Sequence, residues 1–184
     1  MKADKAIKKT ALLGIMGALA LVLGFVEGMF IPDIPFLPVG AKPGLSNVVT
    51  MYAVSVMGLG GGLYITLIKA AFALITRGAT ASAMSLCGGL LSTLAVALLI
   101  RKKGRLFSFV GIGISGALLH NFGQLAVACI ISGTPALSGY GKYLMIFALI
   151  TGAVTGSMLE VIMPGIDKIS NKSKFVKYDK EMKA

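Results

Sequence analysis

Charged residues are scarce in this chain. Only 14% of its 184 residues are charged and 56% are hydrophobic, whereas soluble domains carry about 25% charged residues. The mean hydropathy is +0.87. The two cysteines, Cys87 and Cys129, both lie in apolar runs, which argues against a disulfide framework. Glycine is abundant at 24 residues, and it is commoner in membrane helices than in soluble ones. These values indicate an integral membrane protein.

Several kinds of catalytic chemistry lack the residues that they need. The sequence has no Gly-x-x-x-x-Gly-Lys-Ser/Thr loop, which would hold the phosphates of ATP. Its 7 acidic residues are scattered, so no pair of aspartates is placed to hold magnesium ions for a diphosphate substrate. No Ser/His/Asp or Cys/His set has a supporting spacing, and the single histidine, His120, argues against a metal site. We therefore expect no enzymatic activity, no metal and no cofactor.

Long charge-free stretches mark the candidate membrane spans. A helix needs about 20 apolar residues to cross the hydrocarbon core. In Leu106–Gly141 a breaker cluster, Ser132–Pro135, ends the span near Ile131. The segment Pro43–Thr76 is too long for one span, and Gly58–Gly62 divides it into halves that are short for two. Length alone leaves five or six spans open. The charge-free stretches are Thr10–Val26, Pro43–Ile68, Gly78–Ile100, Leu106–Gly141 and Tyr143–Leu159.

The positions of the basic residues decide between these counts. Most of the 18 Lys and Arg residues form three clusters: before the first span, at Arg101–Arg105, and from Lys168 onward. Positive residues near span ends favour the cytoplasmic side. All three clusters share that side only if Pro43–Thr76 crosses twice. We therefore predict an all-α integral membrane protein of the cell membrane, with six transmembrane helices and both termini cytoplasmic. The net charge of +11 then reflects basic residues on the cytoplasmic side and does not indicate nucleic-acid binding.

The same reading divides the chain into three parts. Residues 1–9 form a basic cytoplasmic N-terminus, residues 10–166 form the six-helix membrane domain, and residues 167–184 form a Lys-rich cytoplasmic tail. The tail is expected to lie in solvent or at the lipid surface.

Polar residues inside a bilayer are costly, so each of them is a candidate for a binding site. Lys69 lies halfway along a predicted helix. His120 and Gln124 are four residues apart and therefore share a helix face. In the predicted orientation these three residues, together with Lys42 and Asn47 at a loop-to-helix junction, line one cavity that opens to the outside.

Each of these residues also has a structural alternative. Lys69 can snorkel, or it can pair with a helix carbonyl or with Glu27, which lies at the outer end of the first helix and can itself join the cavity. Asn47 can serve only as a helix cap. His120 can be only an interhelical hydrogen-bond partner.

Small residues recur every four positions along the first predicted helix. They form two stripes, one of Gly14 and Ala18 and the other of Ala20, Gly24 and Gly28. Such stripes let a second helix approach closely. The partner helix belongs either to this chain or to a separate membrane subunit, and the second possibility makes these five residues a predicted docking surface.

Three motifs resemble a known family. The segment Lys42–Thr50 resembles the K-x-G-L-x-N-[IV]-V-[TL] stretch of the Gx transporter family, also described as heptaprenyl diphosphate synthase component I. The segment Gly116–Gln124 is similar to its G-A-x-x-H-N-x-G-Q element, and Gly88–Ser92 matches its G-G-x-x-S run. The resemblance covers roughly residues 10–165. Pro43 departs from the family, which more often has Leu or another apolar residue there, so the geometry of this helix start is expected to differ.

This family is similar in architecture to the substrate-binding S components of energy-coupling-factor importers. Those six-helix proteins bind small molecules in an outward-facing cavity and dock through the first helix to a transmembrane T subunit driven by two ATPases. The resemblance therefore implies a small-molecule ligand and these partners for this chain. The residues expected to bind the ligand are Lys42, Asn47, Lys69, His120, Asn121 and Gln124. The alternative function is a membrane accessory subunit for isoprenoid-diphosphate synthesis, or for quinone- or flavin-linked electron transfer.

Overall fold

The computed structural model describes residues 2–30, 44–101, 108–133, 139 and 141–172. Over these residues the fold is entirely helical and contains no strand, so the all-α part of the predicted fold class is confirmed for the described part of the chain. Each of its five helices is long and apolar enough to cross a membrane. The helices are α1 (Lys2–Phe30), α2 (Leu45–Arg77), α3 (Ala79–Ile100), α4 (Phe109–Ser132) and α5 (Gly141–Lys172).

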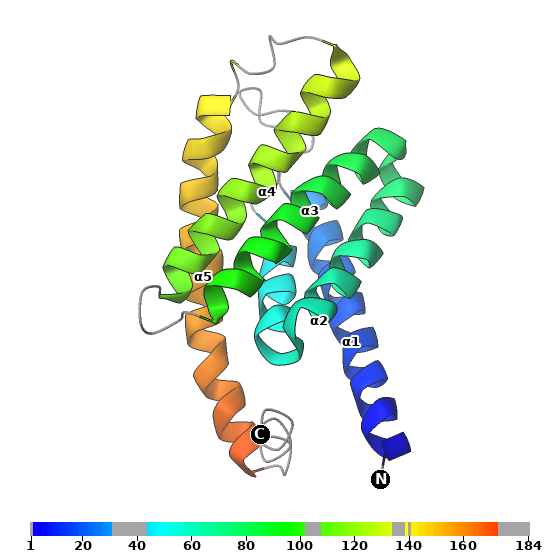
Figure 1. Ribbon diagram of the computed structural model, residues 1–184, viewed down its shortest axis with the longest axis vertical. Helices are drawn as coiled ribbons and strands as arrows, with labels where there is room; N and C mark the ends of the chain where they lie inside the picture. Colours follow the sequence, from blue (N-terminus) through cyan, green and yellow to red (C-terminus); the bar gives the residue numbers. More distant parts are fainter. Residues whose placement is uncertain (1, 31–43, 102–107, 134–138, 140, 173–184) are drawn as a thin grey trace.

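Helix α2 is kinked at Gly58, within the glycine run that was predicted to divide this segment. Gly58 has a φ of 72° and a ψ of −168°, which is not a helical conformation. Only glycine adopts this region readily, because other residues carry a Cβ. Figure 1 shows the first part of α2 (cyan) and the second part (teal) running in different directions. The structure retains one kinked helix here, so the predicted count of six separate helices is not confirmed.

Two helices extend beyond the predicted membrane domain. Helix α1 begins at Lys2, within the predicted N-terminal segment, and α5 continues to Lys172, past the predicted start of the tail. A single residue, Gly78 with a φ of 86°, joins α2 to α3. Ser108 caps α4 by accepting a hydrogen bond from the backbone N–H of Gly111 at 3.2 Å. The start of α1 and the end of α5 lie at the same end of the molecule (Figure 1).

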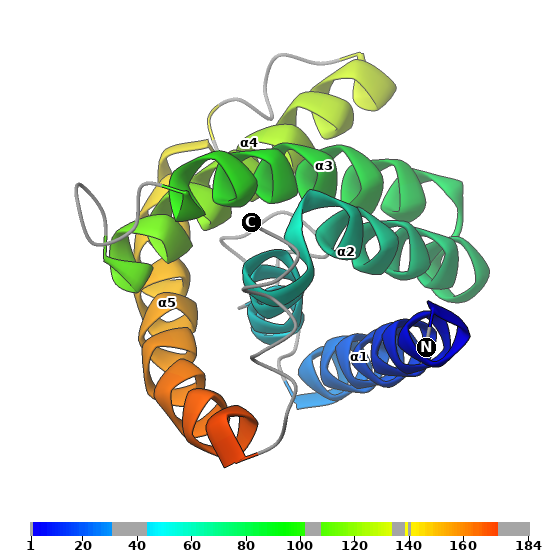
Figure 2. The same cartoon turned by 60° about the horizontal axis from the view of Figure 1, so that its bottom comes forward.

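The helices pack in the order in which they follow along the chain. Each contacts the next, and α2 also contacts α5. Viewed from the end, α1 and α5 stand at the two ends of a curved row, with the first part of α2 between them (Figure 2). Apolar side chains of α1 and both parts of α2 form one core cluster, and those of α2, α3, α4 and α5 form another.

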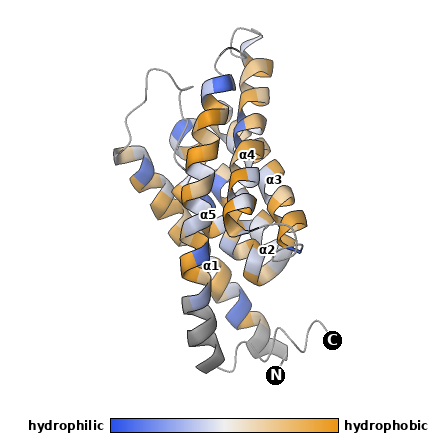
Figure 3. Cartoon of the chain, turned by 90° about the vertical axis from the view of Figure 1, so that its left-hand side faces the viewer, coloured by the Kyte–Doolittle hydropathy of each residue, from blue (hydrophilic) through white to orange (hydrophobic). Residues whose placement is uncertain are grey.

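The distribution of polar and apolar residues suits a lipid environment. The outer faces carry large exposed hydrophobic side chains, such as Ile75 (84% exposed) and Ile130 (79%). Figure 3 shows that the visible helix faces are mostly hydrophobic. The interior instead contains hydrogen-bonded polar pairs, such as the hydroxyl groups of Thr66 and Thr93 at 2.8 Å. A bilayer solvates an apolar exterior, whereas interior polar groups must find partners within the protein.

Candidate functional site: a polar cavity among four helices

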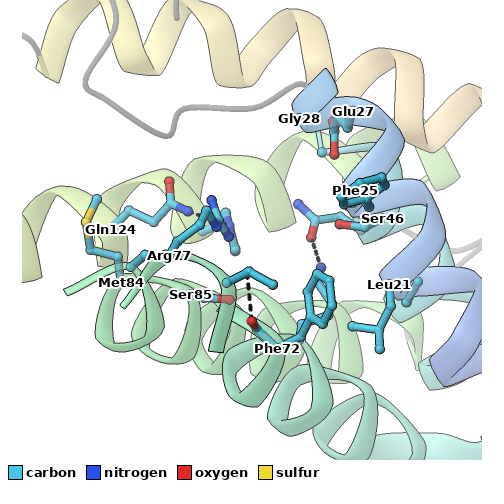
Figure 4. A pocket seen from close by; sticks show the side chains of 18 of the residues that line it. Leu21, Phe25, Glu27, Gly28, Ser46, Phe72, Arg77, Met84, Ser85 and Gln124 are labelled. Carbon is cyan, nitrogen blue, oxygen red and sulfur yellow. Dashed lines mark hydrogen bonds between the residues drawn. The ribbon is translucent and has the colours of Figure 1, made fainter. Parts of the chain in front are cut away.

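A cavity of about 330 Å³ lies between α1, α2, α3 and α4. This volume is at the small end of the range typical of ligand pockets, about 300–1,000 Å³. The first part of α2 supplies one wall and the second part another, because the kink at Gly58 separates them. Figure 4 shows side chains from the surrounding helices converging on this space.

Lys69 and Asn47 meet in the wall of the cavity. The Lys69 ammonium donates a hydrogen bond to Oδ1 of Asn47 at 2.7 Å. Asn47 belongs to the first part of α2 and Lys69 to the second, so this bond links the two sides of the kink. The N-cap of α2 is Gly44, with no side-chain cap hydrogen bond, so Asn47 does not serve as a helix cap.

His120 and Gln124 form the α4 wall of the cavity. Their Nε2 atoms are 3.1 Å apart, so the amide of Gln124 donates to the imidazole ring. The other ring nitrogen, Nδ1, is buried and has no hydrogen-bond partner within the described residues. Nδ1 faces Gly88 of α3, where a Cβ would lie 3.2 Å from it. The backbone carbonyl oxygen of His120 would lie even closer to that Cβ, at 2.5 Å, so the glycine allows the backbones of α3 and α4 to approach each other.

Charges of both signs surround Lys69. Glu27 of α1 is 2% exposed, and its Oε1 accepts a hydrogen bond from the backbone N–H of Leu45 at 2.8 Å. This contact ties the end of α1 to the start of α2. Glu27 and Arg77, at the end of α2, line the same cavity as Lys69, so two basic side chains and one acidic side chain contribute to its wall.

A second, much smaller space lies beside Lys69. It has a volume of about 10 Å³, roughly that needed for one water molecule. Its lining is largely hydroxyl-bearing: Thr50, Thr66, Ser85 and Ser92 contribute to it. The polar environment of Lys69 therefore extends from the cavity into the α2–α3 interface.

The structure brings together most of the predicted site residues. Asn47, Lys69, His120 and Gln124 all line the cavity, as does Glu27. Asn121 does not: it is buried, and its side-chain amide donates to the backbone carbonyl of Leu144 in α5 at 3.1 Å. Lys42 lies outside the described residues.

The two small-residue stripes of α1 face in different directions. Ala20 is buried in the core, and Ala20, Gly24 and Gly28 all line the cavity. A Cβ at Gly24 would lie 3.7 Å from that of Ser46. Ala20 and Gly24 therefore face the interior of their own chain, whereas Gly28 is exposed. Gly14 and Ala18 are exposed on the outer face of α1.

Sequence reasoning missed several residues of the cavity, chiefly Phe72, Arg77 and Ser85. A usable signal was present, because Phe72 and Arg77 follow Lys69 by three and eight positions and so lie on the same helix face. Ser85 lies on α3 and required knowledge of how α2 and α3 pack.

Fold and site together define a class: a chain that is helical over the described residues and consistent with a multi-pass membrane protein, with a small cavity among four helices that polar residues line in part. Within this class the particular family is also clear. The family described as heptaprenyl diphosphate synthase component I matches residues 16–162, which is most of the chain, and the protein belongs to that family. No curated protein and no solved structure matches the chain.

Proposed function

We propose that this protein is the substrate-binding component of an energy-coupling-factor-type importer, with six membrane passes and both termini in the cytoplasm. The observation that carries the proposal is the cavity itself, in which Lys69, Asn47, His120 and Gln124 converge from two helices. Buried polar groups around a small cavity serve to hold a ligand in a defined orientation. The kink at Gly58 supports two passes within α2, because the two parts of that helix diverge there.

The partners in this proposal are a transmembrane T subunit and two cytoplasmic ATPases. Gly14 and Ala18 are the docking residues, since both are exposed on α1. A Cβ added at Gly14 meets nothing within 4 Å. A helix of the T subunit can approach the backbone closely at such small residues. Replacing Gly14 by Leu is expected to reduce co-purification of the T subunit. Ligand binding should be unchanged, because Gly14 does not line the cavity.

The second candidate function is an accessory role in heptaprenyl diphosphate synthesis, and the description of the family favours it. In that case the chain would assist a separate prenyltransferase. The cavity of about 330 Å³ is far smaller than a heptaprenyl chain, so it would enclose at most part of such a molecule.

One experiment separates the two candidates. The full chain is purified from its native membrane, and both the proteins and the small molecules that accompany it are identified by mass spectrometry. The transport proposal predicts a bound small molecule that a Lys69→Met variant loses, together with T-subunit and ATPase partners. A chain without any small molecule, accompanied by a prenyltransferase whose product length depends on it, would establish the accessory role instead.

A further inference from the structure

The cavity has a mainly polar side and a mainly apolar side. In Figure 4, Arg77, Ser85 and Gln124 lie on one side together with Met84, whereas Leu21, Phe25 and Phe72 lie on the other together with Ser46. The first group consists mainly of hydrogen-bonding side chains from α2, α3 and α4. The second group is mainly apolar and comes from α1 and α2. Lys69 connects these two groups, since it shares a helix face with both Phe72 and Arg77. Asn47 is hydrogen-bonded to Lys69.

The polar side favours an anion. Lys69 and Arg77 are its two cations, and an ammonium has three N–H donors, of which one is used by Asn47. The carboxylate of Glu27 is engaged by the backbone of Leu45 and lies apart from Arg77 (Figure 4). Cations in a low-dielectric space are stabilised by an anionic partner, and guanidinium groups bind phosphate and carboxylate in a bidentate manner.

The apolar side favours a ring or a short alkyl group. Phe25 and Phe72 present aromatic surface, and Leu21 adds aliphatic surface beside them (Figure 4). Aromatic side chains bury large areas and stack favourably on other rings. A volume of about 330 Å³ accommodates a compact ligand of this kind.

We propose that the cavity binds an amphipathic anion. Its phosphate or carboxylate group is held by Arg77 and Lys69, and its aromatic or short aliphatic part lies among Leu21, Phe25 and Phe72. This inference rests on the proposed substrate-binding function and names the chemical class of the substrate. The anion is either a free small molecule or the headgroup region of an anionic lipid, since both offer the same chemistry.

Calorimetric titration of the full chain in phosphatidylcholine nanodiscs tests this class with three probes. Phenyl phosphate carries both features, inorganic phosphate carries only the anion, and phenyltrimethylammonium carries the ring with the opposite charge. We expect phenyl phosphate to bind most tightly. Arg77→Gln and Phe72→Ala should each weaken its binding by about tenfold or more, because each removes one of the two interactions. Arg77→Lys should recover part of the loss, because it restores the charge.

Matched controls remove a similar group outside the cavity. Lys142→Gln removes a cation from the start of α5, where Lys142 lies 5.0 Å above the ring of Tyr143. Phe122→Ala removes an exposed aromatic ring from the outer face of α4. Both should change the dissociation constant of phenyl phosphate by less than about twofold, as expected for positions that do not touch the ligand. Unfolding temperatures of all variants identify any loss that arises from misfolding.

Each outcome bears on the proposal. If phenyltrimethylammonium binds as tightly as phenyl phosphate or more tightly, the ligand is not an anion. If inorganic phosphate binds as tightly as phenyl phosphate, the apolar residues do not contribute to binding. Absence of binding by all three probes overturns the proposed class, while the substrate-binding function is judged separately by the small molecule recovered from native membranes. Repeating the titration with phosphatidylglycerol in the nanodisc distinguishes the sources. Weaker phenyl phosphate binding there assigns the site to a lipid headgroup, and unchanged binding assigns it to a free anion.

Discussion

Helices meet in two different ways in this molecule, at the α4–α5 interface and around the cavity. Between α4 and α5, glycines bring the backbones into direct contact: a Cβ at Gly152 would lie 2.5 Å from Cα of Ile114, and one at Gly156 would lie 2.6 Å from the carbonyl oxygen of Phe109. Around the cavity, Phe72 and Lys69 project into the space between the helices. Close backbone contact leaves no room for a ligand between α4 and α5. The α3–α4 contact beside the cavity is also close, since a Cβ at Gly88 would lie 2.5 Å from the carbonyl oxygen of His120, so the cavity lies to one side of that contact, toward α1 and α2.

This comparison assigns different roles to neighbouring polar residues. Asn121 bonds across the α4–α5 interface to Leu144, while His120, one residue earlier, lines the cavity. The α4–α5 interface thus acts as the support, and α1, α2 and α3 with one face of α4 form the site. Substitutions on either side of this division are expected to differ in effect, and a glycine at the α4–α5 contact should have the largest.

Gly152→Ala should be the most destabilising of these substitutions. Its methyl group would overlap the backbone of Ile114, which cannot move aside as a flexible side chain can. We expect the free energy of unfolding to fall by about 3 kcal/mol. Gly14→Ala is the control, because a Cβ there meets nothing within 4 Å. Unfolding in detergent measures both, and equal stability of the two variants would contradict the close contact of α4 with α5.

Gly58→Ala should have the next largest effect, because it places a Cβ at the kink between the two parts of α2. The φ of 72° with a ψ of −168° is available almost only to glycine, and we expect a loss of about 2 kcal/mol. Gly60→Ala is a control two residues away, where no positive φ is required and nothing lies within 4 Å. If Gly58→Ala is as stable as Gly60→Ala, the helix does not need this conformation.

Glu27→Gln should have the smallest effect on stability. The amide oxygen of Gln can still accept the N–H of Leu45, but the interaction of a negative charge with the N-terminus of α2 is lost. We expect a loss of about 1 kcal/mol. Glu160→Gln serves as the control, since Glu160 is exposed on α5. If Glu160→Gln lowers the free energy of unfolding as much as Glu27→Gln does, the contact of Glu27 with the start of α2 does not contribute specifically to stability.

Much of the fold follows from the sequence, because span lengths depend on local composition. The helix Ala79–Ile100 differs by one residue from the predicted stretch Gly78–Ile100. The position of the break in α2 was also indicated by Gly58–Gly62. The α4–α5 contact was not predicted, since the role of Gly113, Gly152 and Gly156 depends on which backbone faces them.

The cavity was predictable to a lesser degree. Lys69, His120 and Gln124 were identified because polar residues are rare at that depth in a membrane. Asn121 was included with them, but successive residues of a helix point about 100° apart, and its side chain turns toward α5. Arg77 was missed although its spacing of eight residues from Lys69 places it on the same helix face. Helix ends and interhelical distances are properties of the packed structure.

The most direct test of the division between site and support compares Lys69→Met with Asn121→Ala. For both variants one measures the dissociation constant of the small molecule recovered from the native protein, alongside the unfolding temperature. Lys69→Met should weaken binding by about thirtyfold or more, because it removes a charged donor from the cavity. Asn121→Ala should lower the unfolding temperature and leave the dissociation constant within about twofold of the wild-type value, because its hydrogen bond lies away from the cavity. If Asn121→Ala abolishes binding while Lys69→Met binds normally, the ligand site is not the cavity described above.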